Sequence, residues 1–183
     1  SDKTYFKTTV FETWKARIPW LLLLMVSATF TGMIITSFED ALAAYTVLTA
    51  YIPMLMDTGG NSGGQASVTI IRALSLEEIE FSDIFRVIWK ESRVAILCGL
   101  TLSICNFVKL LLFDRVTVQV ALVVCITLAV TVLMAKIIGC TLPILAKKIG
   151  FDPAVMASPF ITTIVDAISL IVYFRVASIF LGI

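Results

Sequence analysis

The chain has 183 residues and a formal net charge of +1, and 59% of its residues are apolar while 15% are charged. Its mean hydropathy of +1.01 lies far above that of a soluble domain. The near-zero charge gives no reason to expect nucleic acid as a partner. The sequence has no histidine, which excludes histidine-based zinc sites, general bases and proton relays.

Five uncharged or nearly uncharged runs recur along the chain, at residues 18–38, 41–56, 94–108, 116–135 and 154–174. A helix that crosses a bilayer needs about 20 mostly apolar residues. The runs lack the alternating pattern of a barrel strand, and only helices or closed barrels can cross lipid. We therefore predict an all-α, polytopic membrane protein in which residues 18–183 form one pore domain of five transmembrane helices.

Residues 1–17 precede the first of these runs. Phe6, Val10 and Trp14 share one helical face there, with Lys7 and Arg17 able to reach lipid headgroups. This pattern predicts an interfacial amphipathic helix, and a connecting helix packed on protein is the alternative. Because the chain starts at Ser1, we expect it to be part of something longer.

Later segments complete the predicted topology. Ser75 is expected to cap a helix over residues 76–90, and Asp152-Pro153 suits the start of the fifth span. Most Lys and Arg residues fall in segments on the side of the N-terminus, which predicts a cell inner (plasma) membrane protein with its N-terminus in the cytoplasm and its C-terminus outside. Lys136 is expected to extend to the inner interface.

The end of the second span carries the first group of polar residues. Asp57 and Asn61 step by four along the chain, as do Gln65 and Thr69, so a helix would place all of them in one stripe. Pro53 is expected to free the Thr49 carbonyl. Glycines at 59, 60, 63 and 64 permit close helix packing or local unwinding. Tight packing alone would not explain the polar stripe, which favours a functional role.

The fifth span carries the second group. Asp166 is its central residue, and a carboxylate near the middle of a bilayer costs about 3 kcal/mol on insertion scales. The polar residues that we expect on the same helical face are Ser158, Thr162, Ser169 and Tyr173. An ion pair with Lys136 is the alternative partner for Asp166. We disfavour it because Lys136 belongs nearer to the inner surface.

Both stripes contain a carboxylate and neither contains a cation, which points to an imported positive ion. Oxygen ligands without histidine or clustered thiols favour Mg²⁺, Mn²⁺ or Ca²⁺ over zinc or copper. Mg²⁺ keeps several waters and uses one or two carboxylates, which suits these stripes. The residue chemistry alone leaves Mn²⁺, Co²⁺ and Ca²⁺ open.

Two segments also carry a family resemblance. The runs PMLMDTGGNSGGQAS at 53–67 and DPAVMASPFITTIVDAISLIVYF at 152–174 resemble the two signature regions of the MgtE family of magnesium channels or transporters. The resemblance covers essentially the whole chain as that family's transmembrane domain. It implies a homodimer with a cation pore at the dimer axis, lined by the second and fifth helices. An odd number of spans independently favours a dimer over an internal repeat.

The resemblance also assigns roles. It makes Asp166 the pore aspartate that holds hydrated Mg²⁺ near the membrane centre, and Asn61 the asparagine beside the pathway. It implies cytosolic regulatory domains, a helical domain and a pair of CBS modules whose Mg²⁺ binding closes the gate. Those domains lie outside this sequence, and residues 1–17 would connect to them.

Our hypothesis is a channel-like Mg²⁺ pathway driven by concentration and membrane potential. Asp166 binds the hydrated ion, Thr162 and Thr163 bond its water shell, and Asp57 and Asn61 line the inner half. A proton- or sodium-coupled divalent cation carrier is the first alternative. An intramembrane aspartic protease is a remote one, because Asp57 is expected near the inner surface, far from Asp166. We expect no enzyme.

Overall fold

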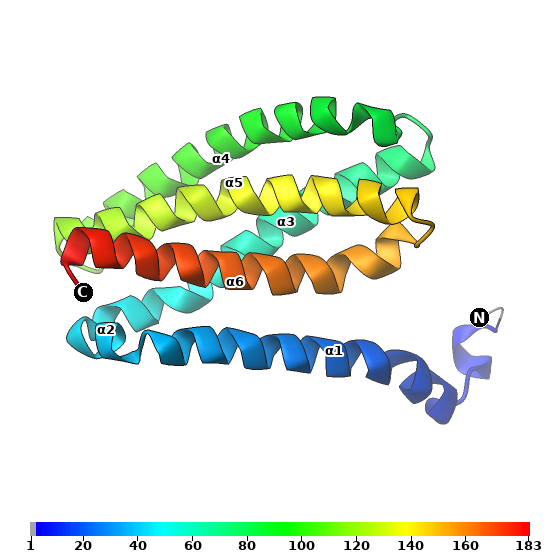
Figure 1. Cartoon of the computed structure of the whole chain (residues 1–183), viewed down its shortest axis with the longest axis horizontal. Coiled ribbons are helices and arrows are strands. Elements are labelled where there is room, and N and C mark those ends of the chain that lie inside the picture. The colour runs from blue at the N-terminus through cyan, green and yellow to red at the C-terminus, as the bar shows by residue number, and fades with distance from the viewer. Residues whose placement is uncertain (1–2) are drawn as a thin grey trace.

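The computed structural model describes residues 3–183, apart from the side chains of residues 156–158. Within this part the chain forms only helices, of which the long ones run side by side along one bundle (Figure 1). The two termini lie at opposite ends of the bundle, which we call its N-terminal and C-terminal ends. The α5–α6 loop shares the N-terminal end, and the α4–α5 loop shares the C-terminal end.

Helix α1 (Val10–Ser37) begins at a capping box in which Thr9 and Glu12 bond each other's backbone N–H groups. It continues past Pro19 without a boundary at residues 17 and 18. The expected amphipathic helix over residues 4–17 is therefore not a separate element. Its residues form a 3₁₀ turn, η1 (Tyr5–Lys7), and the first two turns of α1.

The second predicted span is interrupted. It consists of α2 (Glu39–Ala44), a 3₁₀ helix η2 (Thr46–Tyr51) and the start of α3 (Ile52–Ser75). Tyr45 breaks the helix with φ −133° and ψ 76°. Pro53 occupies the first turn of α3, where its missing N–H costs nothing. The expected free carbonyl is absent, because the Thr49 oxygen accepts a hydrogen bond from the Ile52 N–H.

The remaining helices are α4 (Ile84–Leu112), α5 (Val118–Lys148) and α6 (Pro153–Leu181). As predicted, Asp152 caps α6, its carboxylate accepting from the Ala154 N–H at 3.0 Å. The prediction for Ser75 is wrong, since it is the last residue of α3 and donates to the Arg72 carbonyl at 2.9 Å. The helix expected over 76–90 forms only in its second half: residues 76–83 are a turn that contains η3 (Phe81–Asp83), and residues 84–90 are the start of α4.

Four segments of the described chain are long and apolar enough to cross a membrane: Val10–Ser37, Phe81–Leu112, Val118–Lys148 and Pro159–Leu181. They support a multi-pass membrane location. Helix α3 crosses the other long helices obliquely from one end of the bundle to the other, and it is too polar to meet the same requirement (Figure 1). Its polarity is therefore the property that distinguishes it from the other long helices.

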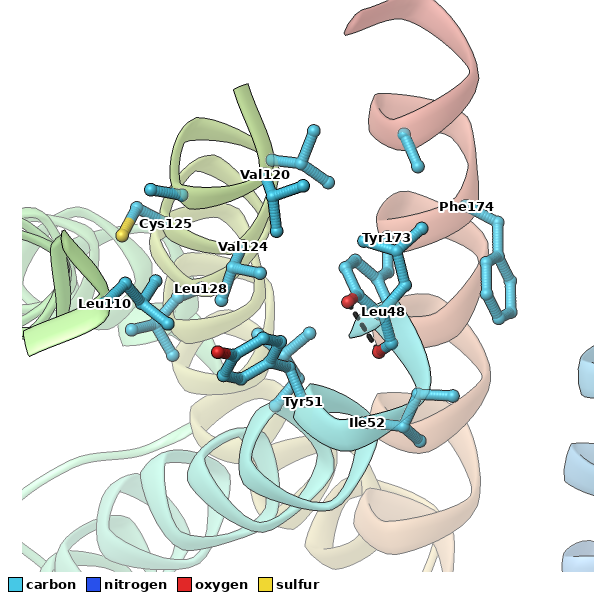
Figure 2. Packing of buried hydrophobic residues seen from close by; sticks show 14 of the residues in the cluster. Leu48, Tyr51, Ile52, Leu110, Val120, Val124, Cys125, Leu128, Tyr173 and Phe174 are labelled. Carbon is cyan, nitrogen blue, oxygen red and sulfur yellow. Dashed lines mark hydrogen bonds between the residues drawn. The ribbon is translucent and has the colours of Figure 1, made fainter. Parts of the chain in front are cut away.

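Helix α5 is the centre of the bundle and packs against α3, α4 and α6, while α1 packs on α6. The largest hydrophobic cluster lies toward the C-terminal end (Figure 2). There the buried Tyr173 hydroxyl of α6 donates to the Leu48 carbonyl of η2 at 2.7 Å. This bond gives the buried Tyr173 hydroxyl a partner in the apolar core and ties α6 to the helix interruption.

A polar cluster closes the C-terminal end above this core. The Asp114 carboxylate, in the α4–α5 turn, accepts from the Tyr51 hydroxyl and from the Lys109 ammonium, each at 2.8 Å. These bonds connect the end of η2 to the turn between α4 and α5. The bond from Lys109, followed by that from Tyr51, lowers the pKa of Asp114 below its usual 3.8.

Glycines set the distance between α3 and α5. A methyl group added at Gly139 of α5 would overlap the carbonyl oxygen of Gly63 in α3. We predict that Gly139→Ala destabilises the protein by about 1–3 kcal/mol, because backbone atoms cannot move aside as a flexible side chain can. Gly32→Ala in α1 is the matched control, since nothing lies within 4 Å of that position. Thermal unfolding in detergent should show a lower Tm only for Gly139→Ala, and equal Tm values would contradict the packing.

The Asp114 cluster predicts an acid dependence. A carboxyl group whose pKa is lowered in the folded state stabilises the fold above its unfolded pKa, and that contribution disappears as the pH falls through the folded pKa. The Tm difference between wild type and Asp114→Asn should therefore be constant above about pH 5 and shrink as the pH approaches 3. A difference independent of pH would show that the Asp114 charge does not stabilise this end.

Candidate functional site

The four central glycines of α3 lie in two different surroundings: two are packed against other helices and two border open space. Added methyl groups at Gly59 and Gly63 would lie 2.8 Å from Val165 and 2.9 Å from Ile161 of α6, so these two glycines permit the close approach of α3 to α6. Nothing lies within 4 Å of the same position at Gly60 or Gly64. Tight packing therefore explains one pair of glycines and leaves the other unexplained.

The second pair borders an open space. Gly60 and Gly64 line a cleft of about 190 Å³ between α3 and α6. Its other lining residues are Ser67, Val68 and Ile71 of α3 and Ala154, Ile161 and Thr162 of α6. We call this space the α3–α6 cleft. Side chains at 60 and 64 would occupy it, so their absence keeps it open.

The two candidate carboxylates lie at nearly the same level of the bundle. A methyl group added at Gly59, two residues after Asp57, would lie 2.8 Å from Val165 and 3.3 Å from Ser169, which flank Asp166 along α6. Our expectation that Asp57 lies far from Asp166 is therefore wrong. It assumed a straight helix from residue 41, whereas the interruption at Tyr45 places Asp57 only five residues into α3.

Asp166 lies near the middle of α6, about 20 Å from either end at 1.5 Å per residue. It is partly buried, whereas Asp57 and Asn61 are exposed on α3. In a single chain the two aspartates therefore sit where α3 and α6 meet, with an open side. The cleft continues from this level toward the N-terminal end of the bundle.

The stripe predicted on α3 does not remain on one side. Successive steps of four residues advance by 400° around a helix, so each one turns the side chain by about 40°. Asp57 and Asn61 stay near the open face, while Gln65 faces the α4 side, where the Lys136 ammonium donates to its side-chain oxygen at 3.5 Å.

Lys136 also differs from expectation. Its side chain does not reach the interface, because only 4% of the residue is exposed. Among the ion pairs of the described residues there is none between Lys136 and Asp166. The alternative partner for Asp166 that we had disfavoured is therefore not formed.

The stripe predicted on α6 divides in a similar way. Ser169 and Tyr173 are buried, and their hydroxyls donate to backbone carbonyls inside the bundle. Thr162 is exposed and lines the α3–α6 cleft. Thr163 is partly buried and donates to the Pro159 carbonyl at 2.8 Å, which leaves its lone pairs able to accept hydrogen bonds. The side chain of Ser158 lies outside the described part.

The resulting group of ligands is small. It consists of two carboxylates, one amide and two hydroxyls, and no cluster of three or more His, Cys, Asp or Glu residues that could hold a metal occurs in the described part of the chain. Such a set cannot replace the whole water shell of a divalent cation. It can attract a hydrated cation and accept hydrogen bonds from its waters.

Comparison with known proteins agrees with this chemistry. Residues 52–176 match the MgtE family model, which is described as a divalent cation transporter. The matched part includes every candidate residue of α3 and α6. The family description and the curated relatives below are those of transporters and not of proteases.

Relatives cover nearly the whole chain. The magnesium transporter MgtE of Thermus thermophilus is 36% identical over 180 residues, which are 98% of this chain and 40% of the relative. The magnesium transporter MgtE of Bacillus subtilis is 34% identical over 176 residues, which are 96% of this chain and 39% of the relative. The chain thus spans about 40% of the length of these relatives. On the family match and on both identities, the chain belongs to the MgtE family of divalent cation transporters.

Proposed function

We propose that this chain forms a channel-like pathway for Mg²⁺, driven by the concentration gradient and the membrane potential. One observation carries the proposal: Asp57 and Asp166, from two different helices, lie at one level beside a cleft that two glycines keep open. The relatives that are named magnesium transporters favour Mg²⁺ as the ion.

Hydrated Mg²⁺ fits the residues of the site. Asp166 is the central binding carboxylate, and Asp57 stands opposite at the same level. The Asn61 amide and the hydroxyls of Thr162 and Thr163 accept or donate hydrogen bonds to the water shell. Mg²⁺ gives up its waters reluctantly and is held in proteins by one or two carboxylates, which is what each chain offers. Mn²⁺, Co²⁺ and Ca²⁺ share this oxygen chemistry and are the competing ions to test.

A second copy of the chain would complete the pathway. The polar side of α3 and α6 is open in the single chain, and an exposed carboxylate in the middle of a membrane is costly unless it meets water, a partner or an ion. We propose a homodimer with the pore at its axis, so that two Asp166 carboxylates share one ion. Helix α3 is then the fifth membrane crossing.

Orientation and further partners complete the proposal. The N-terminal end of the bundle faces the cytoplasm, following the distribution of Lys and Arg. The cytosolic regulatory domains that the family resemblance implies stay a prediction. A proton- or sodium-coupled carrier would use the same Asp166, and proton movement together with Mg²⁺ in vesicles would distinguish it from a channel.

The role of Asp166 gives a first test in proteoliposomes loaded with a Mg²⁺-sensitive dye. Asp166→Asn keeps the size of the side chain and removes its charge, so Mg²⁺ entry should fall at least tenfold, because a divalent ion loses its central counter-charge. Asp40→Asn, the same change at an exposed carboxylate of α2, should leave entry unchanged. Wild-type entry in Asp166→Asn would exclude the proposed role.

The α3–α6 cleft gives a second test. Gly64→Leu places a side chain into open space, so it should reduce Mg²⁺ entry at least tenfold by occupying the pathway while the Tm changes by only a few degrees. Gly32→Leu makes the same change at an open position of α1 and should affect neither quantity. Unchanged entry in folded Gly64→Leu would show that ions do not use this cleft.

A further inference from the structure

Lys136 is a buried cation that the proposed pathway does not use. It projects from the central helix α5, and only 4% of its surface is exposed. Its polar contact is to the Gln65 oxygen at 3.5 Å, the outer limit of a direct bond. No carboxylate lies within 4 Å of its ammonium among the described residues. A buried charge without a close counter-charge is strongly unfavourable and calls for an explanation.

The surroundings of Lys136 explain how the charge is tolerated. The side chain borders two adjoining open grooves between α3 and α4, of about 560 and 400 Å³. The polar residues that share these grooves are Ser62, Gln65, Thr69, Glu91 and Thr101. Glu91 thus borders the same groove without being an ion-pair partner, and grooves of this size admit water. Water in these grooves would hydrate the ammonium, and no ion pair with Glu91 cancels its charge at close range.

The field of the Lys136 charge reaches the polar face of α3. Gln65, which Lys136 contacts, is one helical turn from Asn61 and two turns from Asp57, so about 12 Å of helix separates it from the level of the two aspartates. A charge at this distance still acts on a divalent ion, and it acts twice as strongly as on a monovalent one.

We infer that Lys136 sets how tightly the pathway holds its cation, by placing a fixed positive charge behind the α3 wall on the N-terminal side of Asp57 and Asp166. It is a positioning residue and does not touch the ion. Its charge opposes the attraction of the carboxylates, so the divalent ion is held less tightly at them and leaves them more readily. The inference rests on the proposed function and adds a determinant of ion occupancy to it.

The test measures the Mg²⁺ concentration that gives half-maximal entry into dye-loaded proteoliposomes. Lys136→Gln removes the charge and keeps a group able to bond Gln65. We expect the half-maximal concentration to fall about three- to tenfold, and the maximal rate to fall with it. This range is the Coulomb interaction of one charge with a divalent ion over about 12 Å at an effective dielectric constant of about 40–80. Lys136→Arg retains the charge and should restore both values.

A structural role would give a different pattern. If Lys136 only supported packing, both variants would lower the Tm and the maximal rate, and the half-maximal concentration would stay at the wild-type value. That result would overturn the inference, as would a half-maximal concentration that rises in Lys136→Gln. The wild-type protein is the reference. If it admits Mg²⁺ and the half-maximal concentration is unchanged in Lys136→Gln, only this inference is rejected. If the wild-type protein admits no Mg²⁺, the proposed function is rejected together with this inference.

Discussion

The close backbone approach of α3 to α5 and α6 is the constraint on which the site depends. Gly63 lies against the backbone of α5 at Gly139, and Gly59 against Val165 of α6. Once these glycines face the neighbouring helices, the 100° step of an α-helix directs their successors Gly60 and Gly64 toward the open cleft. Asp57 and Asn61 are directed outward by the same geometry. A helix with larger residues at 59 and 63 could not present this face so close to Asp166.

The long helices could be predicted from the sequence because the hydrophobic runs are long and the helix starts have clear signals. The start of α6 at Asp152-Pro153 is the best example, and its cap forms as expected. The interruption at Tyr45 could not be predicted, because residues 41–56 read as one apolar run. A tertiary bond from Tyr173 of α6 to Leu48 lies beside this interruption, and no local pattern reveals it. The predicted depth of Asp57 was wrong because it assumed an uninterrupted helix from residue 41.

The candidate residues could be found from the sequence, but their surroundings could not. Polar residues at steps of four identify a face, yet the 40° drift per step decides which members share it over three turns. Gln65 therefore turns toward Lys136, and Ser169 and Tyr173 turn into the core. Which of four glycines packs and which lines a cleft depends on where α5 and α6 lie. Only the three-dimensional arrangement supplies that information.

The bond between Tyr173 and Leu48 also has a consequence for how this protein tolerates change in length. It fixes one point on α6 and one point at the helix interruption. From these points the chain continues for about nine residues from Leu48 to Asp57 and for about seven from Tyr173 back to Asp166, which brings the two carboxylates to one level. Inserting one residue between Leu48 and Asp57 would rotate Asp57 by about 100° and shift it by about 1.5 Å. Substitutions in this short segment can be accommodated by repacking, whereas insertions and deletions would misalign the pair, so its length is under stronger constraint than its composition.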